Sequence, residues 1–194
     1  YLNRHSKGVR APLEARTAVF ESGGRYAALI TCDLGSVPEE IVRKTRELAD
    51  AGFPGKQIGI FICASHTHSG PASWEIEGWG HPDYPYWYLL PARLFASIES
   101  AMNRLEEVRL SFGEAECRHI GCNRVFDRDA PDLQEVLKDD WTPAKPELTD
   151  TECRVIRMDD ARGTLKGFAA YFGCHPVVCS ADSHFIHGDY PGIA

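Results

Sequence analysis

The sequence has no uninterrupted apolar run of the roughly 18 residues that a membrane-spanning helix needs. It also has no excess of positive charge, because 21 lysines and arginines stand against 28 aspartates and glutamates, for a formal net charge of −7. Since nucleic-acid binding depends on a basic surface, this balance argues against a nucleic-acid partner. CxxC motifs, internal repeats and low-complexity stretches are absent as well. What remains is the composition of an ordinary globular domain.

The seven cysteines are an odd number, so they cannot all pair in disulfides within one chain. Four of them, Cys32, Cys63, Cys153 and Cys174, lie in or at the ends of apolar segments, where a free cysteine usually acts as a small buried hydrophobe. This pattern favours a reducing compartment such as the cytoplasm. The chain begins at Tyr1 and shows no signal peptide, so we leave its compartment open.

The order of apolar segments predicts an α/β fold, a mixed sheet flanked by helices. Strands at 25–32 and 58–63, with a helix between them, form a predicted βαβ unit. Ser36 and Glu39 have the spacing of a capping box, which places the start of that helix at Ser36. A second helix is expected over 86–106. Further strands are expected at 16–21, 108–113, 117–121, 152–159 and 164–174. The length of the chain favours a single domain over residues 1–194.

Two histidines follow the apolar strand predicted at 58–63, in the segment Ser65-His66-Thr67-His68-Ser69-Gly70-Pro71. They therefore lie at the carboxyl end of a strand, where ligands bind in open α/β sheets. On an extended backbone, residues i and i+2 point the same way, so both rings can reach one site. A pair with one packed and one solvated histidine would give the same sequence pattern. The pair alone is therefore compatible with a metal or catalytic site and with a purely structural role.

A third histidine, His175, follows the apolar run at 164–174, and Pro176 then ends the strand. If the two strands share one sheet and run parallel, His66 and His175 converge at one edge. Two imidazoles suit Zn²⁺, which needs a third protein ligand in a structural or catalytic site. The candidates for that ligand are His68, Asp33, His187 and Asp189.

Two of the other candidate residues have simpler interpretations. Asp33 ends the strand predicted at 25–32, where it could orient a ligand histidine through the second ring nitrogen or serve only as a turn residue. For His184 and His187 the sequence predicts an exposed loop.

Trp74 and Trp79 belong to an aromatic loop after the histidine pair, which we expect to line a substrate pocket. Alternatively, these rings pack on the sheet or on a partner subunit, which leaves a homo-oligomer open.

The order of these motifs resembles the N-terminal catalytic domain of the neutral/alkaline non-lysosomal ceramidase family. His-Thr-His-Ser-Gly-Pro at 66–71 is the specific element. After it come Asn-Arg at 123–124, a strand ending in His175, and Gly-Asp at 188–189. An upstream strand that ends in Asp-Leu-Gly at 33–35 is similar too. The resemblance runs from about Ala18 to Ala194.

This resemblance implies a zinc-dependent amide hydrolase that cleaves the N-acyl bond of a sphingoid lipid. The family's two histidine zinc ligands correspond to His66 and His175. The residues that contact the substrate or its oxyanion correspond to His68 and Arg124. The family's other two zinc ligands, a Glu and a Tyr, and its proposed catalytic Ser follow the Gly-Asp motif, so we expect the domain to be incomplete. Family members are often secreted or membrane-associated.

Three functions therefore stay open for the chain. The first is a zinc amide hydrolase of the ceramidase type. The second is a metallohydrolase of the same fold that acts on a soluble, non-lipid amide or ester. The charged segment at 127–150 favours this second function. So does the segment after Asn-Arg, which reads Val125-Phe126-Asp127-Arg128-Asp129 where the family carries a longer motif with Ser, Pro and Tyr. The third is a truncated, non-catalytic domain that binds a metal or a protein partner.

Overall fold

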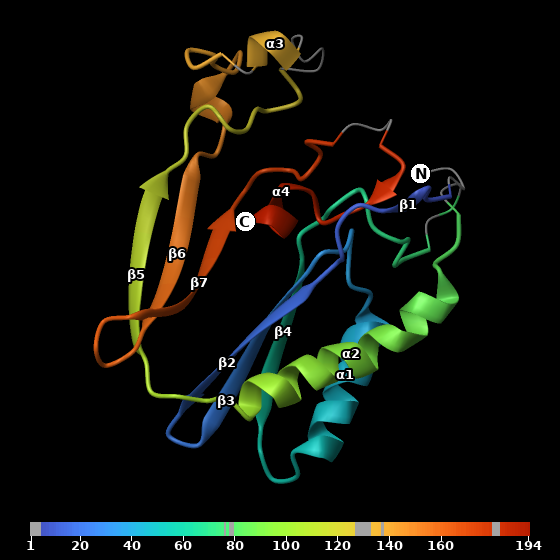
Figure 1. The fold of residues 1–194 in the computed structure, drawn as a ribbon, viewed down its shortest axis with the longest axis vertical. Coiled ribbons are helices and arrows are strands. Elements are labelled where there is room, and N and C mark those ends of the chain that lie inside the picture. Colours follow the sequence, from blue (N-terminus) through green and yellow to red (C-terminus); the bar gives the residue numbers. More distant parts are fainter. Residues whose placement is uncertain (1–4, 76, 78–79, 127–132, 137, 180–182) are drawn as a thin grey trace. The chain divides into compact units, whose positions relative to one another are not determined.

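The computed structural model describes residues 5–75, 77, 80–126, 133–136, 138–179 and 183–194. Its contacts divide the chain into two compact units (Figure 1). The first unit comprises residues 1–105 and 176–194, and the second comprises residues 106–175. The prediction of one domain over 1–194 stays a prediction.

The first unit is built on a three-stranded mixed sheet in the order β2-β3-β4. Strands β2 (Ala15–Ser22) and β3 (Arg25–Cys32) form an antiparallel hairpin, and β4 (Ile58–Ala64) runs parallel to β3. The hairpin turns at Gly23 and Gly24, whose φ values of 58° and 79° favour glycine. The parallel pair is connected through a helix, so the predicted βαβ unit is confirmed.

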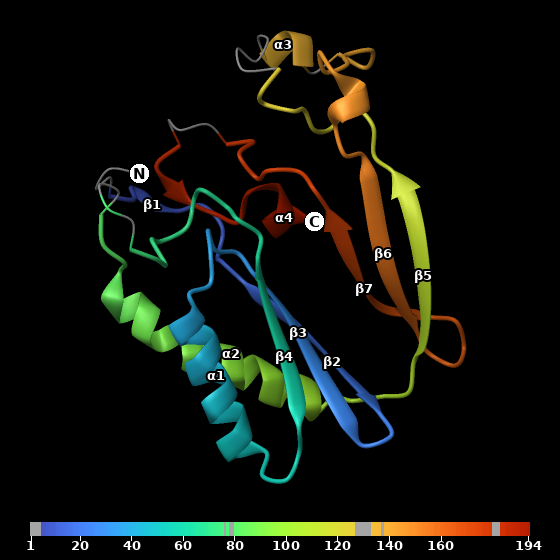
Figure 2. The ribbon, with the colours of Figure 1, turned by 180° about the vertical axis from the view of Figure 1, so that it is seen from behind.

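Helices α1 (Glu39–Gly52) and α2 (Tyr84–Met102) cover one face of this sheet (Figures 1 and 2). Alternate residues of β3 point toward them and are buried, as the period of a half-buried strand requires. Pro91 lies inside α2. The core of the unit consists of Ala28, Ile30, Cys32, Leu34, Ile41, Ala49, Ile60, Leu90, Leu94, Ile98 and Met102.

The capping box predicted at Ser36 is wrong. Helix α1 begins at Glu39, and its N-cap is Pro38, which has an extended ψ of 148° and offers no side-chain cap. The residue before a proline is disfavoured in the helical region, so Val37 cannot continue a helix that starts at Ser36. The carbonyl of Ser36 instead accepts a hydrogen bond from Ser73.

The first unit closes with short elements from the two ends of the chain. Strand β1 (Gly8–Val9) pairs in parallel with β8 (Phe185–Ile186), and α4 (Asp189–Ile193) follows β8. Among the described residues, no helix combines the length and apolar character that a membrane span requires.

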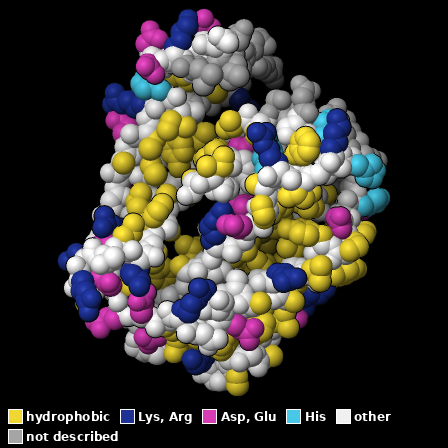
Figure 3. Space-filling view, in the orientation of Figure 1, with side chains coloured by type: hydrophobic (Ala, Val, Ile, Leu, Met, Phe, Trp, Pro, Cys, Tyr) yellow, Lys and Arg dark blue, Asp and Glu magenta, His cyan; other side chains and the backbone are white. Residues whose placement is uncertain are grey.

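The second unit contains an antiparallel sheet in the order β5-β6-β7. Its strands are β5 (Arg109–Glu116), β6 (Glu152–Asp159) and β7 (Leu165–Phe172), joined with α3 (Leu133–Val136) and the 3-10 turn η1 (Pro146–Leu148). Hydrophobic side chains gather on the surface of this sheet (Figure 3); the most exposed are Phe112, Phe168 and Tyr171.

One strand prediction for the second unit is wrong, whereas the strand predicted at 164–174 is present as β7. Residues 117–121 form a turn, because His119 adopts a left-handed φ of 63° that a strand does not allow. The strand that precedes His175 belongs to the β5-β6-β7 sheet, whereas the strand that precedes His66 belongs to the β2-β3-β4 sheet. The two histidines therefore do not follow parallel neighbours in a single sheet.

Candidate metal centre

The loop that carries His66 begins where β4 ends, and its backbone is hydrogen-bonded to the end of β3 and the residues after it. Ser65 N–H donates to the carbonyl of Cys32 at 2.8 Å, and His66 N–H donates to the carbonyl of Leu34 at 2.9 Å. His66 adopts a φ of 66°, which is uncommon for a residue other than glycine. The expectation of an extended backbone at this position is therefore wrong, because a left-handed turn places the ring.

The ring of His66 is oriented by a backbone carbonyl. Its Nδ1 lies 2.5 Å from the carbonyl oxygen of Gly35. A carbonyl oxygen can only accept, so Nδ1 carries the hydrogen and the neutral ring keeps its lone pair on Nε2. A hydrogen bond of this kind commonly fixes the tautomer of a metal-binding histidine. The orienting role considered for Asp33 thus falls to Gly35.

His68 lies beside His66, as the sequence predicts. The two ring centroids are 5.1 Å apart, and the ring planes are nearly perpendicular at 87°. His66 is exposed and His68 is half-buried. The histidine motif therefore presents two imidazoles on one loop, which is the kind of donor pair that Zn²⁺ prefers.

The same loop is hydrogen-bonded to the segment around His187. Thr67 is 2 % exposed, and its hydroxyl donates to the carbonyl of His187 at 3.1 Å while accepting from Ser69 N–H at 3.2 Å. His187 N–H donates in turn to the carbonyl of Ser69 at 3.0 Å. The prediction of an exposed loop at His187 is wrong, because these bonds bury the residue to 5 % exposure.

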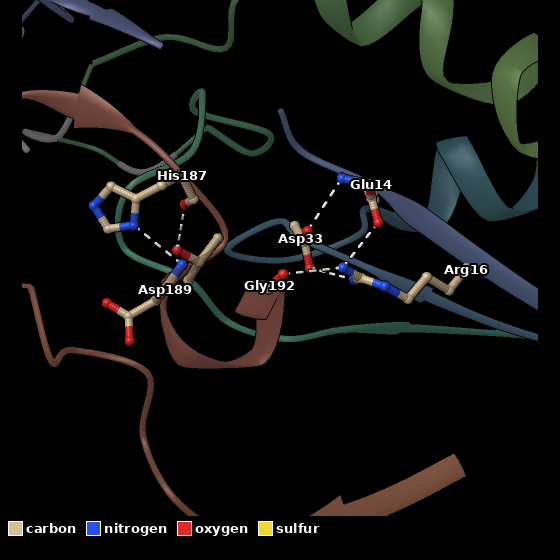
Figure 4. A network of polar contacts seen from close by, with 7 residues as sticks. Glu14, Arg16, Asp33, His187, Asp189 and Gly192 are labelled. Atoms are coloured by element: carbon tan, nitrogen blue, oxygen red, sulfur yellow. Dashed lines mark hydrogen bonds and ion pairs between the residues drawn. The ribbon is translucent and has the colours of Figure 1, made fainter. Parts of the chain in front are cut away.

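Asp33 anchors a second polar network at the end of β3 (Figure 4). It is 3 % exposed, and its carboxylate accepts from Glu14 N–H at 3.1 Å and from Arg16 Nη1 at 3.2 Å. Arg16 also donates through Nη2 to the carbonyl of Gly192 at 3.2 Å. This network ties the first hairpin to α4, so Asp33 has a structural role.

Cys179, His187 and Asp189 form a further cluster whose ligand atoms all lie within 4.8 Å of one another. Asp189 N–H donates to Nδ1 of His187 at 3.1 Å, which places the ring hydrogen of the neutral histidine on Nε2. The carboxylate of Asp189 accepts from the backbone N–H groups of Val178, Cys179 and Tyr190. These bonds engage Nδ1 of His187 and the carboxylate of Asp189, so both side chains hold the backbone, while Nε2 of His187 is buried without a hydrogen-bond partner in the described part of the chain.

Three further predicted site residues do not belong to the loop at 65–71. His175 is the last residue of the second unit, and Pro176 returns the chain to the first unit. Arg124 is exposed on a turn of the second unit, where Phe126 N–H donates to the carbonyl of Asn123 at 3.0 Å. Trp79 lies outside the described residues, as do residues 127–132 and 137 of the charged segment.

The second unit also contains a cavity of about 280 Å³ that the sequence did not predict. Its wall includes His119, whose Nδ1 donates to the carbonyl of Trp141 at 2.7 Å. A hydrogen bond from Arg118 holds the pKa of the Glu116 carboxyl below its usual range. The polar lining residues are Glu116, Arg118, His119, Thr142, Thr149 and Thr151.

Comparisons with known proteins agree with this arrangement. The family model for neutral/alkaline non-lysosomal ceramidase, N-terminal, matches residues 1–194. The neutral ceramidase of Pseudomonas aeruginosa is 27% identical over 203 residues, which cover 100% of this chain and 29% of that protein.

Two solved structures have the same fold. One is described as a ceramidase complexed with C2; it aligns with a TM-score of 0.83 and 25% identity, over 98% of this chain and 30% of that chain. The other is neutral ceramidase from Pseudomonas aeruginosa, with a TM-score of 0.82 and 26% identity, over 98% of this chain and 31% of that chain. The chain thus spans less than a third of the length of these relatives. It belongs to the neutral/alkaline non-lysosomal ceramidase family and corresponds to the N-terminal region of that family.

Proposed function

We propose that this chain is the N-terminal part of a zinc-dependent amide hydrolase of the ceramidase type, which cleaves the N-acyl bond of a sphingoid lipid. The observation that supports this proposal most directly is the hydrogen bond from His66 Nδ1 to Gly35, which places the ring hydrogen on Nδ1 and the lone pair of the neutral ring on Nε2, the atom that would bind a metal. Family membership supports the reaction class, because the relatives are ceramidases.

In this proposal His66 and His175 hold the metal ion. An imidazole pair fits Zn²⁺, which when bound polarises a carbonyl group and lowers the pKa of a bound water. The remaining ligands would come from a part of the protein beyond these residues.

His68 and Arg124 act on the substrate in this proposal. His68 shares the loop of His66, so it could donate to the substrate or transfer a proton near the metal. Arg124 cannot act as a base, because a guanidinium stays protonated, but it can hold the developing oxyanion of an amide. Its exposure on a turn leaves the guanidinium accessible to a substrate.

The test uses the purified, zinc-supplied hydrolase of which this chain is the proposed N-terminal part. It measures hydrolysis of three compounds: an N-acyl sphingosine, a water-soluble N-acyl amino acid and a short-chain ester. We expect release of fatty acid from the N-acyl sphingosine. Arg124→Ala should lower kcat/KM by about 10²–10³-fold, the effect of removing one oxyanion donor. Arg162→Ala is the matched control, because Arg162 is also an exposed turn arginine of the second unit.

Two outcomes would contradict the proposal. Hydrolysis of the soluble amide or the ester without hydrolysis of N-acyl sphingosine would assign the protein to the second function considered above. No hydrolysis of any compound by a zinc-loaded, folded protein would indicate a non-catalytic domain.

A further inference from the structure

Ser73, the residue before Trp74, is hydrogen-bonded to the turn at 34–36 that follows β3. Its side chain is 0 % exposed, and its hydroxyl donates to the carbonyl of Ser36 at 2.7 Å. A buried hydroxyl bonded to a carbonyl 37 residues away in sequence constrains both segments. The hydrogen bond from Ser73 therefore restrains the turn at 34–36.

Trp74 packs on the neighbouring residue of the same turn. A Cβ atom added to Gly35 would overlap Cη2 and Cζ3 of the Trp74 indole. The φ of Gly35 is not in the left-handed region, so glycine is required here by the close approach of the ring. Together with Ser73, Trp74 fixes the backbone at 35–36.

This backbone contacts His66 directly. The carbonyl of Gly35 accepts from the His66 ring at 2.5 Å, and the carbonyl of Leu34 accepts from His66 N–H at 2.9 Å. His66 occupies the left-handed region at φ 66°, which is a strained backbone conformation for a residue other than glycine. Such a conformation persists only when the surrounding contacts determine it, and the turn at 34–36 supplies those contacts.

We propose that Ser73 and Trp74 are positioning residues: they hold the Gly35 carbonyl in place, and that carbonyl keeps His66 in the tautomer that presents Nε2 to a metal. The inference rests on the proposed function, in which His66 is a zinc ligand. It assigns Trp74 a role other than lining the substrate pocket, because the ring packs on Gly35.

The experiment measures the His66 tautomer in the metal-free protein by long-range ¹H–¹⁵N NMR, with His66→Gln used to assign the signal. Zinc affinity is measured in parallel by competition with a chelating dye. The variants are Ser73→Ala and Trp74→Leu. The control is Ser97→Ala. It also removes a serine hydroxyl bonded to a carbonyl, that of Leu94 on α2 at 2.7 Å, although Ser97 is only half-buried.

We expect the wild type and Ser97→Ala to show His66 with hydrogen on Nδ1 only. Ser73→Ala and Trp74→Leu should show a mixture of both tautomers, with zinc affinity lowered about 10–100-fold, as for loss of an outer partner of a metal ligand. Ser73→Ala removes only one oxygen atom, so we expect this variant to fold. It therefore tests the inference even if Trp74→Leu does not fold.

A Ser73→Ala protein that folds and keeps the single Nδ1–H tautomer would overturn the inference. If the tautomer becomes mixed in Ser73→Ala but the wild type and His66→Gln bind zinc with equal affinity, the positioning role stands. In that case only the proposed function, with His66 as a zinc ligand, is refuted. The tautomer and the zinc affinity thus separate the two ideas.

Discussion

The hydroxyl of Thr67 lies 3.1 Å from the carbonyl oxygen of His187, so the histidine motif is bonded to a segment 120 residues away in the sequence. Both residues are buried. This bond closes the loop that carries His66 and His68 against the chain that leads into α4.

Replacing Thr67 tests this closure. Thr67→Val keeps the shape but removes the hydroxyl, leaving the buried carbonyl of His187 and the N–H of Ser69 without that partner. We expect a loss of about 1–3 kcal/mol in the free energy of unfolding, measured by urea denaturation. Thr67→Ser retains the hydroxyl and should lose less. Equal stability of the valine and serine variants would show that the hydroxyl does not hold the loop.

Residue 188 must be glycine because a side chain there would collide with Asp33 and with the backbone of α4. A Cβ atom on Gly188 would lie 2.8 Å from Oδ2 of Asp33 and 2.8 Å from Cα of Gly192. Gly188→Ala should therefore lower the free energy of unfolding by about 1–3 kcal/mol, the usual cost of overpacking. Gly59→Ala is the control in the same unit, because a Cβ there meets nothing closer than 3.7 Å. If both alanine variants are as stable as the wild type, the Asp33 network does not constrain this turn.

Cys32 gives a prediction for the pH dependence of stability. Burial, with a further contribution from the charge of Asp33, raises the pKa of the Cys32 thiol from 9.0 to about 12. Above the unfolded pKa, the unfolded chain loses this proton before the folded protein does. Stability should therefore fall as the pH rises from about 9 toward 12, by at most about 1.4 kcal/mol per pH unit from this group.

Cys32→Ala should remove this contribution. Its free energy of unfolding should be lower than that of the wild type near pH 8, but it should decline less steeply through alkaline pH. The measurement is urea denaturation of both proteins across that range, under reducing conditions. Two parallel curves would show that the thiol titrates alike in the folded and unfolded chains.

The parts of the fold that the sequence predicts well are set by local patterns. The strands expected at 25–32 and 152–159 have these bounds in the structure, because alternation of apolar residues is a local property of a half-buried strand. The proximity of His66 and His68 is likewise a consequence of their spacing, although the turn at His66 achieves it in a way that the sequence did not indicate.

The parts that the sequence does not predict depend on contacts between distant segments. The burial of His187 follows from its bonds to Thr67 and Ser69, and the tautomer of His66 follows from a carbonyl 31 residues away. Backbone carbonyls carry no residue-specific signal, so composition and spacing cannot reveal them. The helix start at Glu39 is an exception, since Val37 before Pro38 is a local signal that outweighs the capping box.

The central claim is that His66 and His175 hold a zinc ion, and the most direct test is the metal content of the purified protein by elemental analysis. We expect about one zinc ion per chain in the wild type and in His81→Ala, whose histidine is exposed and paired with Glu75. His66→Ala and His175→Ala should each contain almost none. Retention of zinc by both of these folded variants, or its absence from zinc-supplied wild type, would contradict the account.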